Sequence, residues 1–486
     1  MAIFKKMISD NIHGTISLTK TEDEIVETAY YQRLRWIKQL GFTFYLFPGA
    51  THTRFSHALG VLHVMDRVLK AIGLAVSDEK LFNPKVRDPQ TEFHRKMRLA
   101  ALLHDIGTFP FSHTIELAYI NHWKRQRDHG FQLPMANHER LGSHIIQNTD
   151  FPGGITPILR EGGIDPRDLS ETIGGNSPLV LANQLLHSDI DADRMDYLLR
   201  DAHHTGVKYG VYDLDQLLKS LVAVDYNGQK ILCVHESGLN VAEYFLISRF
   251  FWYSQIIEDS TGYKFDLIAA KIAEYFLEMG QAFSFDELTQ DITQKPSKYF
   301  TFNDSYFMAK VHEYLAQEKS HPVIRELCEM LAMRIAPKQI KIAPVEPTLL
   351  QSTEHKAQVI KEIQRASEWL SAELMKLDPN AWMIFDIPNR DVQFTKDHTS
   401  VTKEAKESKN MHPLLLRDPV KILTRHGEPK LLVEVSNSVV RILSQYRNFV
   451  PRIYVGHKSM ELLEKNGVLE RMQKMAFKED IPLKIS

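Results

Sequence analysis

The chain contains very little cysteine, with Cys233 and Cys328 as its only two among 486 residues. This scarcity excludes a disulfide-rich scaffold and a zinc site built from thiolates. Long apolar runs are also missing, since none approaches the roughly 18 residues of a membrane helix. The first ten residues lack the apolar core of a signal peptide. We therefore expect a cytoplasmic protein with no membrane partner.

An excess of either charge is absent too, because the formal net charge is only −2. This balance argues against dominant nonspecific binding to nucleic acid or to acidic membranes, although local basic patches leave nucleic acid as an option that charge does not support. Hydrophobic residues make up 43% and charged residues 25% of the chain, as in ordinary globular proteins. The length allows two or three domains with a sizeable core.

Histidine is the residue type that is present in an informative pattern. Of the 22 histidines, 13 lie between His52 and His204, which is less than a third of the chain. In a chain with almost no cysteine, such a cluster favours imidazole and carboxylate metal ligands or acid–base chemistry.

Hydrophobic periodicity predicts a mainly helical chain. The first expected helix, 21–40, has Thr21 as a possible N-cap with Glu24 three residues later. A short strand is expected at 230–237. The further helical patterns cover residues 91–106, 138–148, 178–204, 240–280 and 306–335.

The character of the sequence changes from Ala381 onward. Strands are expected in AWMIFDIP, KLLVEV and PRIYVG, VVRILSQY fits either a helix or a strand, and Glu461–Met475 reads as a helix. Residues 395–410 read as a polar loop. The expected domains are a helical body at 1–340, a linker and helix at 341–376, and a small α+β C-terminal lobe at 377–486.

Four side chains of the ligand type stand out, namely His57, His104, Asp105 and Asp193. Each lies in an expected helix or at its end, and helices from distant segments converge in the interior of a bundle. Two imidazoles and two carboxylates suit one divalent metal ion, without distinguishing manganese, iron, zinc or magnesium. Taken singly, each residue could equally be a capping or hydrogen-bonded group. The order and neighbourhood of the motifs favour the metal.

Those motifs are YQRLRWIKQLG, FPGATHTRFSHALGV, HDIGTFPFSH, NHERLGS and DIDADRMDYLLRDAHHTG. Together they resemble the HD-domain deoxynucleoside triphosphate triphosphohydrolases, densely over about residues 10–280. The resemblance implies an HD-domain helical bundle, one divalent metal per active site, and hydrolysis of a deoxynucleoside triphosphate to deoxynucleoside and inorganic triphosphate. It places the metal ligands on the four residues named above.

The resemblance also implies contacts to a deoxynucleotide substrate. Two arginines beside the metal ligands correspond to phosphate contacts, and two residues on the face of the Asp193 helix correspond to sugar contacts, with Asp201 on the 3′-hydroxyl. Two residues before the FPGA loop correspond to positions that pack on the nucleoside, with Gln39 at the sugar edge, and two more lie in a phosphate-binding helix. The eight residues are Arg54, Arg194, Tyr197, Asp201, Gln39, Leu40, Arg249 and Tyr253.

Three residues are candidates for acid–base work. His138 resembles the catalytic histidine of the family, and Glu116 stands where the family has a carboxylate that orients a histidine. Such a carboxylate fixes the tautomer of the imidazole and raises its basicity. His113 is placed to protonate the leaving 5′-oxygen.

The sequence departs from the family in three places. Thr108 replaces a histidine, and threonine cannot act as a general base near neutral pH, so proton transfer falls to His138 or His113, or the chemistry is slower or different. Ile257 stands where tyrosine is common. Asp259 stands where histidine is common, and an acidic residue near a triphosphate is repulsive unless it points away or binds an additional magnesium ion.

Two other functions stay open. One is an HD-type phosphatase or phosphodiesterase that acts on other nucleotides or single-stranded nucleic acid. The other is a non-catalytic nucleotide-binding assembly protein, against which the intact ligand set argues. The resemblance further implies a homo-oligomer (a dimer, tetramer or hexamer) with a nucleotide effector at a subunit interface.

Overall fold

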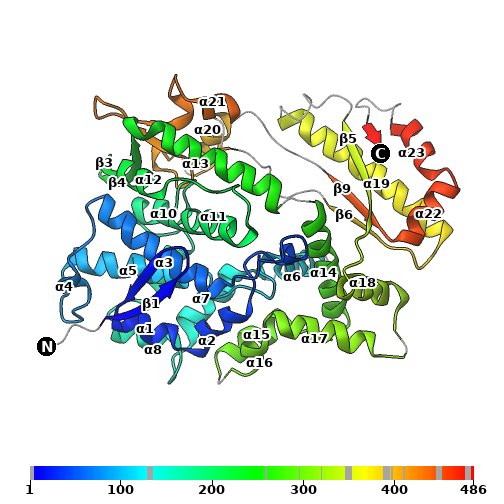
Figure 1. Ribbon diagram of the computed structural model, residues 1–486, viewed down its shortest axis with the longest axis horizontal. Coiled ribbons are helices and arrows are strands. Elements are labelled where there is room, and N and C mark those ends of the chain that lie inside the picture. The colour runs from blue at the N-terminus through cyan, green and yellow to red at the C-terminus, as the bar shows by residue number, and fades with distance from the viewer. Residues whose placement is uncertain are drawn as a thin grey trace.

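The chain folds into a helical body and a smaller α+β lobe, which confirms the predicted fold class. In Figure 1 the body occupies the left and centre and the lobe the right, with the two termini at opposite ends. The computed structural model describes residues 5–128, 135–257, 260–294, 296–318, 320–344, 353–386, 394–395, 398–408, 411–444, 451–476 and 483–485.

Three helices form the centre of the body. Helix α3 (Arg54–Ala71) is buried along most of its length and packs against α5 (Pro89–Leu103) and α11 (Ala192–Thr205). Local signals set their ends. Asp88 and Asp191 are N-caps that accept hydrogen bonds from backbone N–H groups in the first turns of α5 and α11. The Asp191 cap matters because the predicted metal ligand Asp193 lies in the first turn that it starts, whereas His104 and Asp105 follow the other end of α5.

The N-terminal segment is more broken than predicted. A hairpin of β1 (Lys6–Asp10) and β2 (Gly14–Leu18) precedes it. The expected helix 21–40 is instead divided, because the Thr28 side chain caps a new start by accepting from Tyr31 N–H. The first N-cap is Thr19, in a capping box with Glu22, and not Thr21. The pieces are α1 (Lys20–Val26), α2 (Ala29–Gln32) and a 3₁₀ turn at Arg33–Trp36.

Other long helical patterns are divided in the same way, at local stop and start signals. Pro322 begins a new helix after a break, as expected for proline at a first helical position. The structure divides the predicted helix 178–204 into α10 (Val180–His187) and α11. It divides 240–280 into α13 (Leu239–Trp252), a π-helical turn (Tyr253–Ile257) and α14 (Ser260–Glu278). It divides 306–335 into α17 (Asp304–Leu315) and α18 (Pro322–Ala332). The remaining helices of the body are α4 (Asp78–Leu81), α6 (His113–Asp128), α7 (His138–Asn148), α8 (Ile155–Glu161), α9 (Pro166–Ile173), α12 (Leu214–Ser220), α15 (Phe285–Ile292) and α16 (Lys298–Thr301).

A four-stranded sheet lies at the top of the body in Figure 1. Strand β3 (Leu221–Tyr226) pairs with β4 (Gln229–His235), which pairs in parallel with β7 (Lys421–Leu423), and β8 (Pro429–Leu431) closes the order. Part of the segment that we assigned to the C-terminal lobe therefore returns to the body.

Two helices accompany this returning segment. Within the expected polar loop, α20 (His398–Glu407) buries Val401 and Ala405 against Cys233. The loop prediction is wrong there, because these two apolar residues lie four apart on one helix face. The ambiguous VVRILSQY contains helix α21 (Val439–Leu443), and KLLVEV ends as a 3₁₀ turn after β8.

The C-terminal lobe has its own sheet and its own hydrophobic cluster. Its strands β10 (Leu483–Ile485), β5 (Lys338–Pro344), β9 (Arg452–Val455) and β6 (Met383–Asp386) pair antiparallel in that order. Helices α19 (Thr353–Leu377), α22 (His457–Lys465) and α23 (Val468–Ala476) pack against it, so the predicted last helix is two. The predicted strands at β6 and β9 are present, and β5 and α19 share their core. The domain boundaries themselves stay a prediction.

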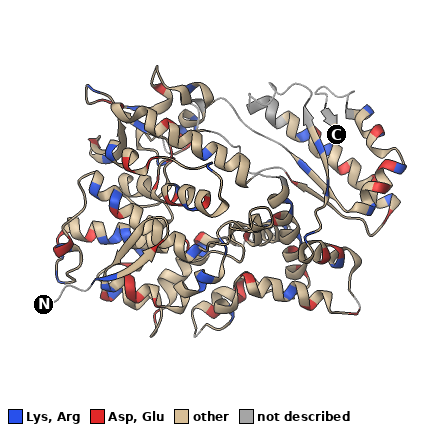
Figure 2. Cartoon of the chain, viewed as in Figure 1, with Lys and Arg blue, Asp and Glu red and all other residues tan. Residues whose placement is uncertain are grey.

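Charged residues of both signs are interspersed along the described helices, as Figure 2 shows. This mixing agrees with the near-zero net charge. Among the described residues, no helix combines the length and the apolar character that crossing a membrane requires.

Candidate functional site

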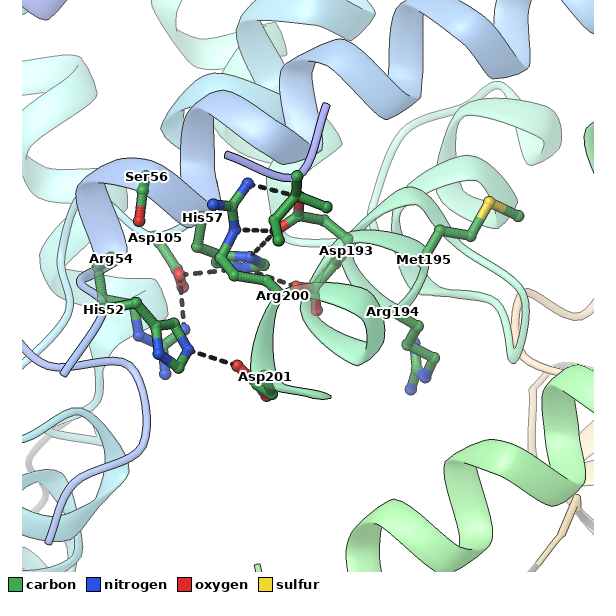
Figure 3. Close-up of polar contacts among 12 residues, drawn as sticks. His52, Arg54, Ser56, His57, Asp105, Asp193, Arg194, Met195, Arg200 and Asp201 are labelled. Atoms are coloured by element: carbon green, nitrogen blue, oxygen red, sulfur yellow. Dashed lines mark hydrogen bonds and ion pairs between the residues drawn. The ribbon is translucent and has the colours of Figure 1, made fainter. Parts of the chain in front are cut away.

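The structure brings the four predicted metal ligands together from three helices. His57 lies in the first turn of α3, His104 and Asp105 directly follow α5, and Asp193 lies in the first turn of α11. His57 Nε2 is 2.9 Å and His104 Nε2 3.7 Å from Asp193 Oδ1. Asp105 Oδ2 is 3.8 Å from His57 Nε2 and 3.5 Å from His104 Nε2. Figure 3 shows His57, Asp105 and Asp193 pointing toward one another.

The second nitrogen of each histidine ring fixes its orientation. His57 Nδ1 is 2.8 Å from Asp196 Oδ2, and His104 Nδ1 is 2.8 Å from the carbonyl oxygen of Ala101. Because both acceptors are oxygens, each Nδ1 carries the hydrogen and each Nε2 presents its lone pair. Both Nε2 atoms are buried, and neither makes a well-directed hydrogen bond to the carboxylates that it faces. This donor set fits a divalent metal ion.

Asp196 connects the metal ligand His57 to the N-terminal hairpin. Its fully buried carboxylate also lies 2.6 Å from His13 Nε2 and accepts from Arg200 Nε at 2.9 Å. Arg200 in turn binds Asp10 of β1 at 2.9 Å. Burial alone raises the pKa of Asp196, but the Arg200 charge and these hydrogen bonds outweigh it and hold the pKa well below its usual value. The carboxylate therefore stays charged.

Sequence reasoning missed this role of Asp196. Its signal in the sequence was the four-residue spacing to Arg200, which is typical of an ordinary ion pair on a helix. The structure adds the close approach of the two helices, because a Cβ atom on Gly60 of α3 would lie 1.9 Å from Asp196 Oδ1. Glycine at position 60 thus leaves room for the carboxylate.

Arg54 contacts the metal ligands directly. Its Nη1 is 2.6 Å from Asp105 Oδ2, and its Nε donates to Ser112 Oγ at 2.9 Å. Ser112 Oγ donates to the carbonyl oxygen of Lys38 at 2.7 Å. The arginine is therefore held beside the predicted metal ligand Asp105 by hydrogen bonds from its Nε and Nη1. Its contact to a phosphate stays a prediction.

The three acid–base candidates form one hydrogen-bonded group. His113 Nδ1 is 2.7 Å from Glu116 Oε2, and His138 Nδ1 is 2.6 Å from Glu116 Oε1. The backbone N–H of His138 also donates to Glu116 at 2.7 Å. Burial raises the pKa of Glu116, but the charge of His138 and the hydrogen bonds from both imidazoles outweigh it, so the pKa lies well below its usual value. Each Nε2 remains for proton transfer.

Thr108 occupies a buried position in the loop between α5 and α6. Its side chain is almost fully buried, and Oγ1 has no hydrogen-bond partner. Its carbonyl oxygen accepts from Arg33 Nη2 at 2.6 Å, so the Arg33 side chain fixes the backbone of this loop. Threonine at this position offers no group that titrates near neutral pH. His113 and His138 therefore stay the two histidine candidates for acid–base chemistry.

The residues predicted to bind the sugar carry buried polar atoms without partners. Gln39 Oε1, Tyr197 OH and Asp201 Oδ2 are each buried and lack a hydrogen bond. Leu40 beside Gln39 is almost fully buried. The ring of Tyr197 packs on Trp252 with 4.6 Å between the centroids. Buried polar groups without partners are rare in folded proteins, so these atoms fit a polar ligand.

Two arginines predicted to bind phosphate are instead paired with aspartates. Arg194 forms an ion pair with Asp191, and Figure 3 shows it pointing away from the metal ligands. Arg249 Nη1 lies 2.8 Å from Asp189 Oδ1, and its Nη2 donates to the carbonyl oxygen of Phe394 at 3.0 Å. The structure therefore does not bring these two guanidinium groups to the predicted metal centre.

The remaining predictions concern the helix after Arg249. Tyr253 begins the π-helical turn and packs against Trp252 at 4.7 Å between ring centroids. Ile257 ends that turn and is partly buried. Asp259 lies outside the described residues.

Comparison with known proteins identifies the central fold. Residues 54–201 match the HD domain model, so the chain contains an HD domain, and this range includes all four predicted metal ligands. Over 245 residues the chain is 35% identical to a Mycoplasma pneumoniae protein described as uncharacterised, covering 50% of this chain and 52% of that one. It is 27% identical over 266 residues to human deoxynucleoside triphosphate triphosphohydrolase SAMHD1, covering 48% and 38%. The chain spans about half the length of the curated relatives it matches.

Two solved structures resemble the whole chain. A hypothetical protein from Aquifex aeolicus superposes with a TM-score of 0.63 at 25% identity, covering 95% of this chain and 100% of that one. A phosphohydrolase from Bacteroides thetaiotaomicron gives a TM-score of 0.61 at 18% identity, covering 93% and 99%. The second similarity shows a shared fold.

Proposed function

We propose that this protein is a metal-dependent phosphohydrolase whose HD domain holds one divalent ion between His57, His104, Asp105 and Asp193. The convergence of two buried Nε2 atoms with two carboxylates from three helices carries this proposal. When bound, such an ion lowers the pKa of a water ligand and polarises a phosphoryl oxygen. Manganese, iron, zinc and magnesium all accept this donor set.

The acid–base group handles the protons. Glu116 engages both Nδ1 atoms, so Nε2 is the atom at which His113 and His138 exchange a proton. Burial lowers the pKa of His138, but the charge of Glu116 and its hydrogen bond outweigh burial and raise the pKa above its ordinary value. His138 therefore holds its proton to higher pH than an ordinary imidazole does, which favours it as the donor to the leaving oxygen over the predicted His113, whose pKa burial lowers.

The leading substrate is a deoxynucleoside triphosphate, which would yield deoxynucleoside and inorganic triphosphate. The name of the human relative, which covers about half of this chain, supports this substrate. The unpartnered polar atoms of Gln39, Tyr197 and Asp201 also suit the sugar of a nucleoside.

A second candidate is a phosphatase or phosphodiesterase acting on a substrate with a single phosphoryl group. The pairing of Arg194 with Asp191 and of Arg249 with Asp189 favours it, because both guanidinium charges are already compensated. A triphosphate carries more negative charge than a monophosphate and needs more uncompensated cations around it. The absence of a histidine at Thr108 supports the same alternative.

One product assay separates the candidates. The protein is incubated with manganese, iron, zinc or magnesium and with single or mixed deoxynucleotides, ribonucleotides and monophosphates, and the products are separated by ion exchange. Inorganic triphosphate supports the leading substrate, and orthophosphate supports the second candidate. Asp193→Asn should abolish turnover, whereas the surface control Asp168→Asn, whose side chain is 43% exposed, should not. Turnover that survives Asp193→Asn would exclude this metal site.

We also propose that the protein is a homo-oligomer with a nucleotide effector at a subunit interface, as the sequence resemblance implies. Light scattering after size exclusion, with and without a deoxynucleotide mixture, tests this assembly. A monomer under both conditions would contradict it.

A further inference from the structure

A buried histidine lies against the predicted sugar-binding carboxylate. His52 Nε2 is 2.6 Å from Asp201 Oδ1, and both side chains are only 1% exposed. The second oxygen, Oδ2, is buried and has no partner. Figure 3 shows this pair beside Arg54, next to the predicted metal ligands. One oxygen of the carboxylate is thus fixed by the protein, and the other is left over.

His52 is also held through its backbone and through the face of its ring. Its carbonyl oxygen accepts from the backbone N–H of Gln39 at 3.0 Å, which places Gln39, another residue predicted to contact the sugar, beside it. Its ring stacks on His204 with 4.4 Å between centroids and 18° between planes. His204 Nε2 lies 3.1 Å from the Asn11 side-chain amide. These contacts leave the His52 ring little freedom, so the direction of its Nε2–H is fixed.

We propose that His52 is a positioning residue, which orients Asp201 so that Oδ2 accepts a hydrogen bond from the 3′-hydroxyl of the substrate sugar. This inference rests on the proposed nucleotide substrate, and it is independent of the length of the phosphate chain. The physical reason is that only one of the two Asp201 carboxylate oxygens, Oδ1, has a partner in the protein. A carboxylate bound at one oxygen by a rigid donor presents its other oxygen in one direction, and a buried unpaired acceptor gains most from a matching hydroxyl.

A purely structural role is the competing explanation, and the molecule offers a matched control for it. His94 Nε2 lies 2.9 Å from Asp66 Oδ1 in another buried imidazole–carboxylate pair, between α5 and α3. Neither residue of this pair is a predicted metal ligand or substrate contact, so the pair has no assigned part in binding or catalysis. His94→Ala therefore measures what a lost buried pair does to the fold alone.

The test compares nucleotides that differ only at the 3′ position. Binding of 2′-deoxy and 2′,3′-dideoxy nucleosides and nucleoside monophosphates is measured by calorimetry on the full-length manganese-loaded protein, and hydrolysis of the corresponding monophosphates and triphosphates is measured by ion exchange. The variants are His52→Ala, His52→Gln, whose amide can donate to Asp201, and His94→Ala, which removes the donor to Asp66. We expect wild type to prefer the 3′-hydroxyl by about tenfold to a hundredfold, as for a hydrogen bond to a charged group.

His52→Ala should reduce this preference to about threefold or less, through KM or Kd rather than kcat, while His52→Gln and His94→Ala keep it. Discrimination in binding without hydrolysis of any monophosphate or triphosphate would support the inference and refute the proposed reaction. Hydrolysis without discrimination would refute the inference alone. An unchanged preference in His52→Ala, an equal loss in His94→Ala, or no binding of either nucleotide series would each overturn it.

Discussion

Single residues orient the two histidines that we propose as metal ligands, through the ring nitrogen that faces away from the proposed metal position. Asp196 is the clearest case, because it accepts from His57 Nδ1 while Arg200 and His13 keep it charged and fixed. Partners of this kind fix the tautomer of a ligating histidine and tune its affinity for the metal. The metal site therefore depends on the hairpin residue Asp10 as well, which holds Arg200.

Asp196→Asn should weaken metal binding by about tenfold to a hundredfold, because the neutral amide loses the charge that holds His57, His13 and Arg200. Competition with a chromophoric chelator for manganese measures the affinity. Asp66→Asn is the control, since it disturbs the other buried imidazole–carboxylate pair and should leave metal affinity unchanged. Equal affinities of wild type and Asp196→Asn would show that this carboxylate has no part in the site.

Glu116→Gln should lower the pKa of His138. Glu116 is the group that raises this pKa against the effect of burial, so its removal lets the imidazole lose its proton at lower pH. If His138 acts as the acid, the alkaline limb of the pH profile of kcat moves to lower pH. Histidine-labelled NMR follows the titration directly, with His144, which lies against the Thr289 carbonyl, as internal reference. A His138 titration unchanged by the substitution would contradict the account.

At the residue scale, the sequence was most informative where residue type alone decides. His57, His104, Asp105 and Asp193 were predicted from their chemistry and their order, and the structure brings them together. The sequence could not show that Arg194 and Arg249 pair with aspartates, because that choice depends on how separate helices and the segment around residue 394 pack.

Elements outside the HD domain hold the loop that leads into the acid–base candidate His113. Asp304, the first residue of α17, accepts from the backbone N–H of Phe111 at 2.6 Å and from that of Lys38 at 2.9 Å. Phe111 and Ser112 adopt positive φ angles of 50° and 58°, which side chains other than glycine rarely adopt. Their strain is stable only because the surroundings fix them. Asp304 thus links α17 to the loop that leads into His113.

Asp304→Ala should destabilise the protein by about 2 kcal/mol or more, because two buried N–H groups lose their acceptor. Turnover should fall as well, since the loop that leads into His113 can relax. Denaturant unfolding measures the first effect and the product assay the second. Asp286→Ala on the exposed first turn of α15 is the control and should change stability by about 0.5 kcal/mol or less. Two variants of equal stability would contradict the linking role.

Helices were predictable as regions but not as separate elements. Periodicity located the 178–204 and 240–280 regions, yet it continued through the breaks because both halves bury apolar faces. Caps such as Thr28 and Asp191 act through one side-chain oxygen each, a signal too local for periodicity to register. Helix α20 was missed because its polar composition hid two buried residues.

Over the whole molecule, the part of the chain after the HD domain reaches back to Arg249, a residue predicted to bind phosphate. Thr395 Oγ1 donates to Asp189 Oδ2 at 2.7 Å, and Phe394 stacks on Phe250 with 4.1 Å between centroids. Burial raises the pKa of Asp189, but the Arg249 charge outweighs it and keeps the carboxylate ionised. This segment therefore stabilises the Asp189–Arg249 pair.

Asp189→Asn should raise the affinity for inorganic triphosphate about tenfold relative to orthophosphate, because Arg249 loses the carboxylate that compensates its charge. Calorimetry on the full-length protein measures both affinities, and the thermal midpoint reports any loss of folded protein. Asp168→Asn on the surface of α9 is the control. An unchanged ratio would show that this ion pair does not set the preference for phosphate chain length.

The metal content of the purified full-length protein tests the central claim most directly. Elemental analysis after loading with manganese, followed by desalting, is compared for wild type, His57→Ala, Asp105→Asn and Asp193→Asn, with His94→Gln and Asp168→Asn as controls. The account predicts one ion per chain in wild type and both controls, and little or none in the three ligand variants. One ion per chain retained in every ligand variant, or none in wild type, would contradict the metal centre on which the proposed function rests.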